Sequence, residues 1–167
     1  ATSGTRPQLR FFGSWDFPAD FCASPQLVSE AYARGVPMGG ELRRAAGSTA
    51  APVFVVAALR DAIEGSPLQQ LQLIKGWVDA DGESRERVVT VASAAAGAES
   101  LCAVWRDPDY AAGQSTWYYA RLLEMPSKVD CADAGSIGEG LEACCEAGHR
   151  DVIQERAWSS PIWVASQ

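Results

Sequence analysis

The sequence contains few of the residues that most metal sites and hydrolase active sites need. It has a single histidine, His149, in 167 residues, whereas zinc sites usually combine several His and Cys side chains at short spacing. It contains neither a Cys-x-x-Cys pair nor a Gly-x-Ser-x-Gly motif. A Ser–His or Cys–His catalytic pair would have to use His149. The usual signatures of a catalytic site are therefore missing, and we assign no catalytic residue and no metal ligand.

Positive charge and long apolar runs are also scarce. The 14 Lys and Arg residues are outnumbered by 21 Asp and Glu residues, which gives a formal net charge of −7. Such a surface repels phosphate backbones and anionic lipids, so we expect no nucleic-acid partner. The longest apolar run, residues 50–59, is too short to span a bilayer. We therefore also expect no membrane insertion.

The length and composition fit one globular domain. Hydrophobic residues make up 47% of the chain and charged residues 21%, which is typical of a soluble fold. The chain begins without an initiator methionine and reaches a strand-like run at residues 8–12. An abrupt start of this kind is typical of mature products and of fragments. We expect residues 1–167 to be a single β-rich domain, and a piece of a longer protein.

Strand-like segments dominate the chain. They are short, rich in Val, Tyr, Trp and Leu, and bounded by turn residues. An Asp-Gly turn at Asp81-Gly82 predicts a hairpin between the third and fourth of them. A second hairpin is predicted across the long polar connection 107–116. The predicted strands are residues 8–12, 53–59, 68–78, 85–93, 100–106, 117–124 and 161–164.

Helix is a minor component. Ser24-Pro25 before residues 26–33 resembles a helix start, and Gly35 would end that helix. Residues 138–146 could form another short helix, and residues 92–98 are expected to be loop. The predicted fold is mainly β: an antiparallel β-sandwich, immunoglobulin-like or related, with one or two short helices and long loops. A half-open barrel is the alternative.

The five cysteines predict a disulfide near the C-terminus. Cys131, Cys144 and Cys145 cluster, and a bridge from Cys131 to either of the other two would hold a Gly-rich segment together. The odd count leaves at least one thiol free or intermolecular. Zinc binding by this cluster with His149, or burial of reduced thiols, are the weaker alternatives.

Acidic pairs and aromatic residues are the remaining candidates for function. Asp16 with Asp20, and Asp107 with Asp109, lie beside prolines. They could bind a sugar or a cation, although such residues are mostly turn formers. The acidic tip at residues 79–83 is expected to be a solvated hairpin and not a calcium site. Trp77, Trp105 and Trp117 are expected in the core, whereas Trp15 and Trp158 could be exposed.

Several segments together resemble one large bacterial family. It is a domain-of-unknown-function family with mostly exported members. Their N-terminal part is similar to metal-dependent hydrolases of the polymerase-and-histidinol-phosphatase (PHP) type. The segments that carry the resemblance are residues 1–6, 10–17, 34–40, 75–77, 105–109, 118–121 and 153–164.

The resemblance implies a role by position. This chain would be the C-terminal part of a periplasmic or secreted protein, with residues 1–6 at the junction. The His and Asp ligands of a divalent metal would lie upstream of Ala1, in a phosphoesterase-like part. The chain itself would hold no cofactor and would pack against that upstream hydrolase-like domain. The candidate contact residues are Arg6, Trp15, Asp16, Met38, Gly39, Gly40 and Trp158.

Two other functions fit the same residues. The first is a free-standing module that binds a glycan or a protein through Trp15, Trp105 or Trp158. The second is an independent enzyme that uses the C-terminal cysteines and His149.

Overall fold

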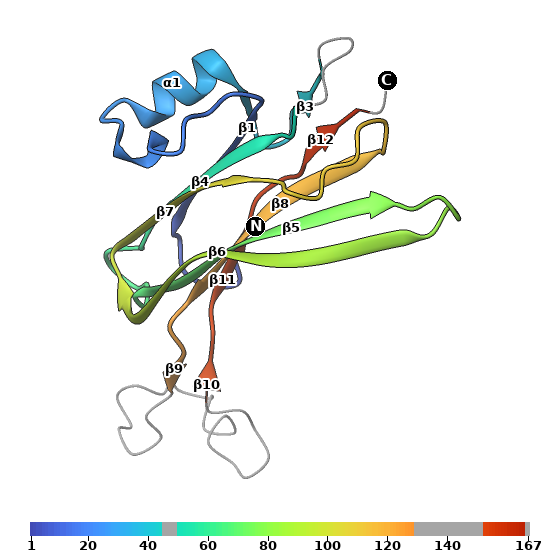
Figure 1. Ribbon diagram of the computed structural model, residues 1–167. Helices are drawn as coiled ribbons and strands as arrows, with labels where there is room; N and C mark the ends of the chain where they lie inside the picture. The colour runs from blue at the N-terminus through green and yellow to red at the C-terminus, as the bar shows by residue number, and fades with distance from the viewer. Residues whose placement is uncertain (45–49, 129–151, 166–167) are drawn as a thin grey trace.

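The computed structural model describes residues 1–44, 50–128 and 152–165. They form two main β-sheets that share one hydrophobic core (Figure 1). One α-helix, α1 (Leu27–Arg34), and a short 3₁₀ turn, η1 (Phe21–Ala23), are present among these residues. The predicted mainly β, antiparallel sandwich is therefore confirmed. The helix predicted at residues 138–146 lies outside the described residues.

The smaller sheet, called here the four-stranded sheet, is antiparallel throughout. Its central strands pair along their whole length, from Gln8 opposite Leu59 to Ser14 opposite Val53. Its order is β2 (Val36–Pro37), β1 (Gln8–Ser14), β4 (Val53–Leu59) and β7 (Ser100–Arg106).

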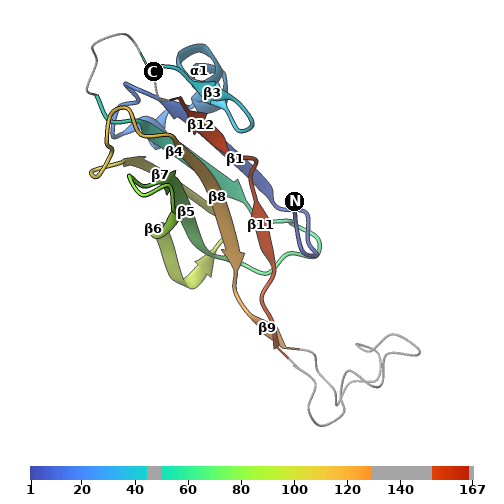
Figure 2. The same cartoon turned by 90° about the vertical axis from the view of Figure 1, so that its right-hand side faces the viewer.

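The larger sheet, called here the six-stranded sheet, is antiparallel except where β3 and β12 pair in parallel. Its edge beside β8 is shared by β11 and β12, and the chain start lies beside β11 (Figure 2). Its order is β3 (Glu41–Leu42), β12 (Ile162–Val164), β8 (Thr116–Glu124), β5 (Leu68–Val78) and β6 (Ser84–Ala98), with β11 (Arg156–Trp158) on β8. A separate pair is formed by β9 (Ser127–Lys128) and β10 (Val152–Ile153).

Period-two alternation sorts each strand into a core face and an outer face. In β8, Tyr118, Ala120 and Leu122 are fully buried, whereas the residues between them are half-buried. They meet Phe54 and Val56 of the four-stranded sheet in the main core cluster. The core is thus formed by every second side chain along the strands of both sheets.

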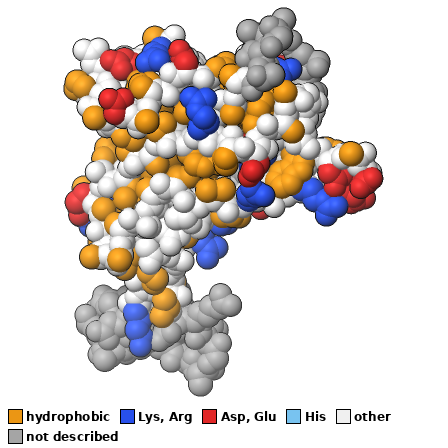
Figure 3. Space-filling model, in the orientation of Figure 1, with side chains coloured by type: hydrophobic (Ala, Val, Ile, Leu, Met, Phe, Trp, Pro, Cys, Tyr) orange, Lys and Arg blue, Asp and Glu red, His pale blue; other side chains and the backbone are white. Residues whose placement is uncertain are grey.

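The first predicted hairpin is confirmed. β5 and β6 pair from Trp77 opposite Arg85 along most of their length. Gly82 has a φ of +82° at the tip, a conformation that favours glycine. Asp and Glu side chains gather with Lys and Arg at this tip, whereas hydrophobic side chains spread over the middle of the same view (Figure 3). The tip is therefore a solvated turn, as expected.

Two predictions about strands are wrong. β7 and β8 do not form a hairpin, because β7 pairs with β4 and β8 pairs with β5 in the other sheet. The connection at residues 107–115 crosses between the sheets instead. Residues 92–98 are strand and not loop, because their backbone continues the pairing of β6 with β5, with Ala92 opposite Leu71 and Ala98 opposite Leu68.

The helix covers one outer face of the sandwich. Ser24 Oγ accepts the Gln26 N–H at 3.1 Å, and α1 then begins at Leu27. Phe17, Phe21 and Ala31 from this region pack on Phe12, Val53 and Val55, which face away from the main core. The four-stranded sheet is consequently buried on both sides along this part.

Candidate functional site

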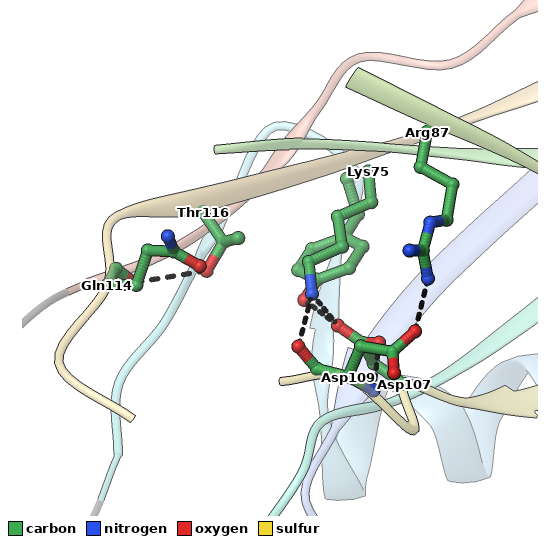
Figure 4. A network of polar contacts seen from close by, with 7 residues as sticks. Lys75, Arg87, Asp107, Asp109, Gln114 and Thr116 are labelled. Atoms are coloured by element: carbon green, nitrogen blue, oxygen red, sulfur yellow. Dashed lines mark hydrogen bonds and ion pairs between the residues drawn. The ribbon is translucent and has the colours of Figure 1, made fainter. Parts of the chain in front are cut away.

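A buried polar network lies between the two sheets (Figure 4). Lys75 Nζ is 2.6 Å from Asp107 Oδ2, and the Tyr118 hydroxyl donates to the same oxygen at 2.6 Å. All three residues are at most 4% exposed. Lys75 also donates to the Asp109 carbonyl oxygen at 2.9 Å. The network therefore ties β5 and β8 to the residue that follows β7.

The charges in this network neutralise one another. A buried charge is costly unless it is paired and hydrogen-bonded, and Lys75 and Asp107 meet both conditions. Burial, and then the hydrogen bond to Asp107, raise the pKa of Tyr118 well above its usual range. Tyr118 consequently stays protonated and donates to the carboxylate. This arrangement suits a structural cross-link better than acid–base chemistry.

The neighbouring carboxylate is engaged as well. The carboxylate of Asp109 contacts the Arg87 guanidinium, and the Asp109 N–H donates to Asp107 Oδ1 at 3.0 Å. Gln114 Nε2 donates to the Val78 carbonyl at 3.1 Å and fastens the far end of the crossing loop. Asp107 and Asp109 thus form a turn and two ion pairs. Their role in the fold is structural, as is usual for acidic residues beside a proline.

Trp15 and Asp16 lie at the end of β1. Trp15 Nε1 donates to the Arg43 carbonyl at 2.9 Å, and the Trp15 ring packs edge-on against Tyr110. Asp16 is exposed and lies 3.5 Å from Arg34. Trp15 is thus held against the core cluster rather than presented to solvent.

The Met38–Gly40 turn is fastened to β12. The Met38 N–H donates to the Phe11 carbonyl, and the Gly39 N–H donates to the Pro161 carbonyl, both at 2.9 Å. Trp163 N–H in turn donates to the Gly40 carbonyl at 3.0 Å. Gly39 has a φ of +87°. The structure therefore brings this predicted segment next to Trp163, and the two line one shallow hollow.

The N-terminal residues add to the edge of β11. The Ala1 ammonium donates to the Trp158 carbonyl at 2.9 Å, and the Trp158 N–H donates to the Ala1 carbonyl at 2.8 Å. Thr5 Oγ1 donates to the buried Glu124 carboxylate at 2.5 Å. Arg6 lies further along and donates its backbone N–H to Asp61. Trp158 is therefore next to the chain start, whereas Arg6 contacts a different loop.

Four aromatic side chains share the outer face of the six-stranded sheet. Trp163 lies opposite Trp117, and Trp158 lies opposite Arg121, so all three tryptophans are on the side of the sheet away from Tyr118. We call this surface the aromatic face. It comprises Trp117, Tyr119, Trp158 and Trp163.

The aromatic face is open. Trp163 is 51% exposed, and its ring centroid is 5.7 Å from that of Trp117. The Trp117 ring lies against the backbone of Gly76, where an added Cβ would be 2.1 Å from the ring. The expectation that Trp117 is a core residue is therefore wrong, because the alternation of β8 turns it outward. Sequence reasoning missed Trp163, although the buried neighbours Ile162 and Val164 imply its direction.

Trp105 and Trp77 lie on the other side. Trp105 is half-buried and packs against Phe54 and Tyr118 of the main core, with ring centroids 6.3 Å from each. Trp77 is also half-buried, and Lys75 Nζ lies 5.6 Å from the centroid of its ring. Both tryptophans predicted in the core are thus only partly buried, and the contacts of Trp105 leave it poorly placed to stack on a glycan.

A disulfide joins Cys22 of η1 to Cys102 of β7, across 80 residues of sequence. The sequence analysis did not predict this pairing, because two cysteines so far apart carry no spacing signal. The predicted cluster of Cys131, Cys144 and Cys145, together with His149, lies outside the described residues. The bridge holds η1 over the four-stranded sheet and lines one side of a groove there.

The described residues contain neither a cluster of metal-ligating side chains nor a membrane-spanning helix. Among residues 1–44, 50–128 and 152–165, no three His, Cys, Asp or Glu side chains converge so as to hold a metal ion. In the same part of the chain, no helix is long and apolar enough to cross a membrane.

The fold and these contacts define a β-sandwich module with a buried cross-sheet ion pair and one open aromatic face. A family model described as "Protein of unknown function (DUF3604)" matches residues 1–96 and 92–166. The chain therefore belongs to the DUF3604 family. No curated protein and no solved structure matches it.

Proposed function

We propose that this chain is the C-terminal accessory module of an exported, PHP-like metal-dependent hydrolase. It would pack against an upstream catalytic part, which is phosphoesterase-like by analogy and would carry the divalent metal. The resemblance of the whole chain to the C-terminal part of such proteins supports this proposal. The disulfide between Cys22 and Cys102 is compatible with export.

The observation that carries the proposal is the position of the chain start at the sheet edge beside the aromatic face. Ala1 exchanges two hydrogen bonds with the Trp158 backbone at an isolated bridge next to β11, so a part that preceded Ala1 would enter beside this face. Trp163 and Val88, 51% and 46% exposed, lie on the same side of the sheet. An open apolar face of this kind marks a protein contact or a ligand site. The upstream part would cover it.

The Gly39-Gly40 turn would form the rim of that contact. It is hydrogen-bonded to the residues on both sides of Ile162, so its backbone moves with β12 and Trp163. Glu41 follows it on β3 directly opposite Trp163, where it pairs with Arg43 at 3.4 Å. Arg6, Trp15 and Asp16 have partners within the module and would contribute less.

The first experiment compares the 167-residue chain with the native gene product. Intact mass from the native source gives the length of that product, and hydrophobic-dye binding measures its open apolar surface. We expect a product several tens of kilodaltons larger, with less dye bound per module and slower amide exchange in β8 and β12. A native mass near 17.8 kDa, or equal dye binding by both proteins, would contradict the proposal.

A matched pair of variants locates the contact. Trp163→Glu should increase dye binding and amide exchange in the longer protein. Tyr32→Glu alters a side chain of similar exposure, 56%, on α1, which covers the other sheet, and should leave both unchanged. An equal response to the two variants would show that the contact does not involve the aromatic face.

The second candidate function is glycan binding by the same face. Trp117 lies flat against Gly76, and its exposed side adjoins Trp163. Polar groups on neighbouring strands flank the rings: Glu86 pairs opposite Gly76, and Arg121 hydrogen-bonds Gln72 at 2.8 Å. Adjacent aromatic rings with polar neighbours suit the apolar face and hydroxyls of a sugar. Tryptophan fluorescence that oligosaccharides change in the wild type but not in Trp163→Ala would support this function.

A further inference from the structure

The outer face of the four-stranded sheet is only half covered by α1 and η1. Alternation places Phe12, Val55 and Val104 in a row beneath these elements. The next row along the strands consists of Arg10, Ala57 and Cys102, and it is not covered by the helix. The boundary between the two rows forms a groove.

The groove has one polar wall and one apolar wall. Its floor is Ala57, whose small side chain leaves room between β1 and β7. Arg10 and Gln8 of β1 line one side, and Leu27 and Val28 of α1 line the other. The volume is about 340 Å³, within the range of small-molecule sites. The lining suits a ligand with one polar end and one apolar part.

The apolar side of the groove is open to solvent. Val28 is 37% exposed and Leu59, at its end, is 49% exposed. The Cys22–Cys102 bridge adds a further apolar surface. An alkyl chain lying on Ala57 would cover Val28 and Leu59 and remove this apolar area from water.

Arg10 supplies the charge. Among the described residues, no hydrogen bond or ion pair engages its guanidinium, whereas Arg34, Arg60, Arg85 and Arg87 each pair with a carboxylate. A guanidinium binds a carboxylate through two parallel hydrogen bonds and remains charged at all physiological pH values. The chain has a net charge of −7, and within it the Arg10 guanidinium is available to bind an external anion.

We propose that this groove binds an anionic amphiphile: a carboxylate held by Arg10, with its alkyl chain on Ala57 between Leu27, Val28 and Leu59. The site is separate from the aromatic face and needs no upstream part. It is built by the disulfide, because Cys22 holds η1 and the start of α1 beside β7. Reduction of the bridge should therefore weaken binding.

Calorimetric titration of the oxidised 167-residue chain with decanoate, and with the neutral decanol of the same chain length, tests the proposal. Arg10→Gln should weaken decanoate about tenfold, the effect of one lost charge-assisted contact, and leave decanol unchanged. Ala57→Leu fills the floor and should weaken both ligands. Arg156→Gln removes the same charge from an exposed side chain outside the groove and should change neither.

Thermal melts first establish that each variant is folded, and the binding results are then compared. Absence of decanoate binding to the wild type overturns the proposal, as does equal affinity of the wild type, Arg10→Gln and Ala57→Leu. Equal binding of decanol and decanoate overturns the role of Arg10. Because only the 167-residue chain is used, the result stands whether or not the proposed upstream part exists.

Discussion

The two outer faces of this sandwich differ in what covers them. On the four-stranded sheet, Phe12, Val53 and Val55 are at most 2% exposed beneath η1 and α1. On the six-stranded sheet, Trp163 and Val88 are 51% and 46% exposed on a face of similar apolar character. Among the described residues, η1 and α1 cover about half of the first face, and neither packs on the second. The open face is therefore where we expect a partner.

The covered face should depend most on its disulfide. A double Cys22→Ser, Cys102→Ser variant should lower the free energy of unfolding by about 4 kcal/mol, because the bridge closes a loop of 80 residues. Urea denaturation measures this loss, and amide exchange should speed up in η1 and α1 before it does in β8. Unchanged stability would show that packing alone holds the cover. Reduced wild type serves as the control.

The core between the faces should depend on its ion pair. Lys75→Met leaves Asp107 buried beside Tyr118 without a cation, and we expect a loss of about 3 kcal/mol. The double variant Lys75→Met, Asp107→Leu removes both charges and should recover part of that loss. Urea denaturation of the wild type, of Lys75→Met, of Asp107→Leu and of the double variant measures the coupling. A double variant as unstable as the sum of its single variants would mean that the two charges do not interact.

The open face has one tightly packed point, at Gly76. A Cβ there would be 2.1 Å from the Trp117 ring, so Gly76→Ala should displace that ring and cost about 2 kcal/mol. Tryptophan fluorescence should change at the same time. Gly113→Ala is not a suitable control, since its φ of +89° adds backbone strain. Gly76→Ala in a Trp117→Ala background, where the ring is gone, should cost far less.

The smallest effect is expected at the exposed end of the open face. Trp163→Ser removes a side chain that is already half in water, so the 167-residue chain should lose less than about 1 kcal/mol. The same change should have a larger effect on the longer protein if the upstream part covers this face. Thermal melts of the 167-residue chain and of the longer protein measure the difference. Equal shifts in melting temperature would show that the upstream part does not cover the aromatic face.

Local patterns in the sequence predicted much of the fold and part of the site. β4, β5 and β7 agree with their predicted bounds, because runs of branched and aromatic residues end at turn residues. Asp81-Gly82 and Ser24-Pro25 marked the hairpin and the helix for local reasons of backbone conformation. Trp158 and the Gly39-Gly40 turn were recognised as candidates and do lie along β11 and β12. The groove at Arg10 and the exposure of Trp163 were missed.

The sequence by itself determined the bounds of β4, β5 and β7 and, through period two, which residues of one strand share a face. Only the tertiary structure decided which strands pair, since alternation is the same whether β7 joins β8 or β4. Contacts between residues far apart in the chain favour the observed pairing: the disulfide of Cys22 with Cys102, and the ion pair of Lys75 with Asp107. Such pairs form only when packing brings the sheets together, because a local backbone preference says nothing about a distant partner.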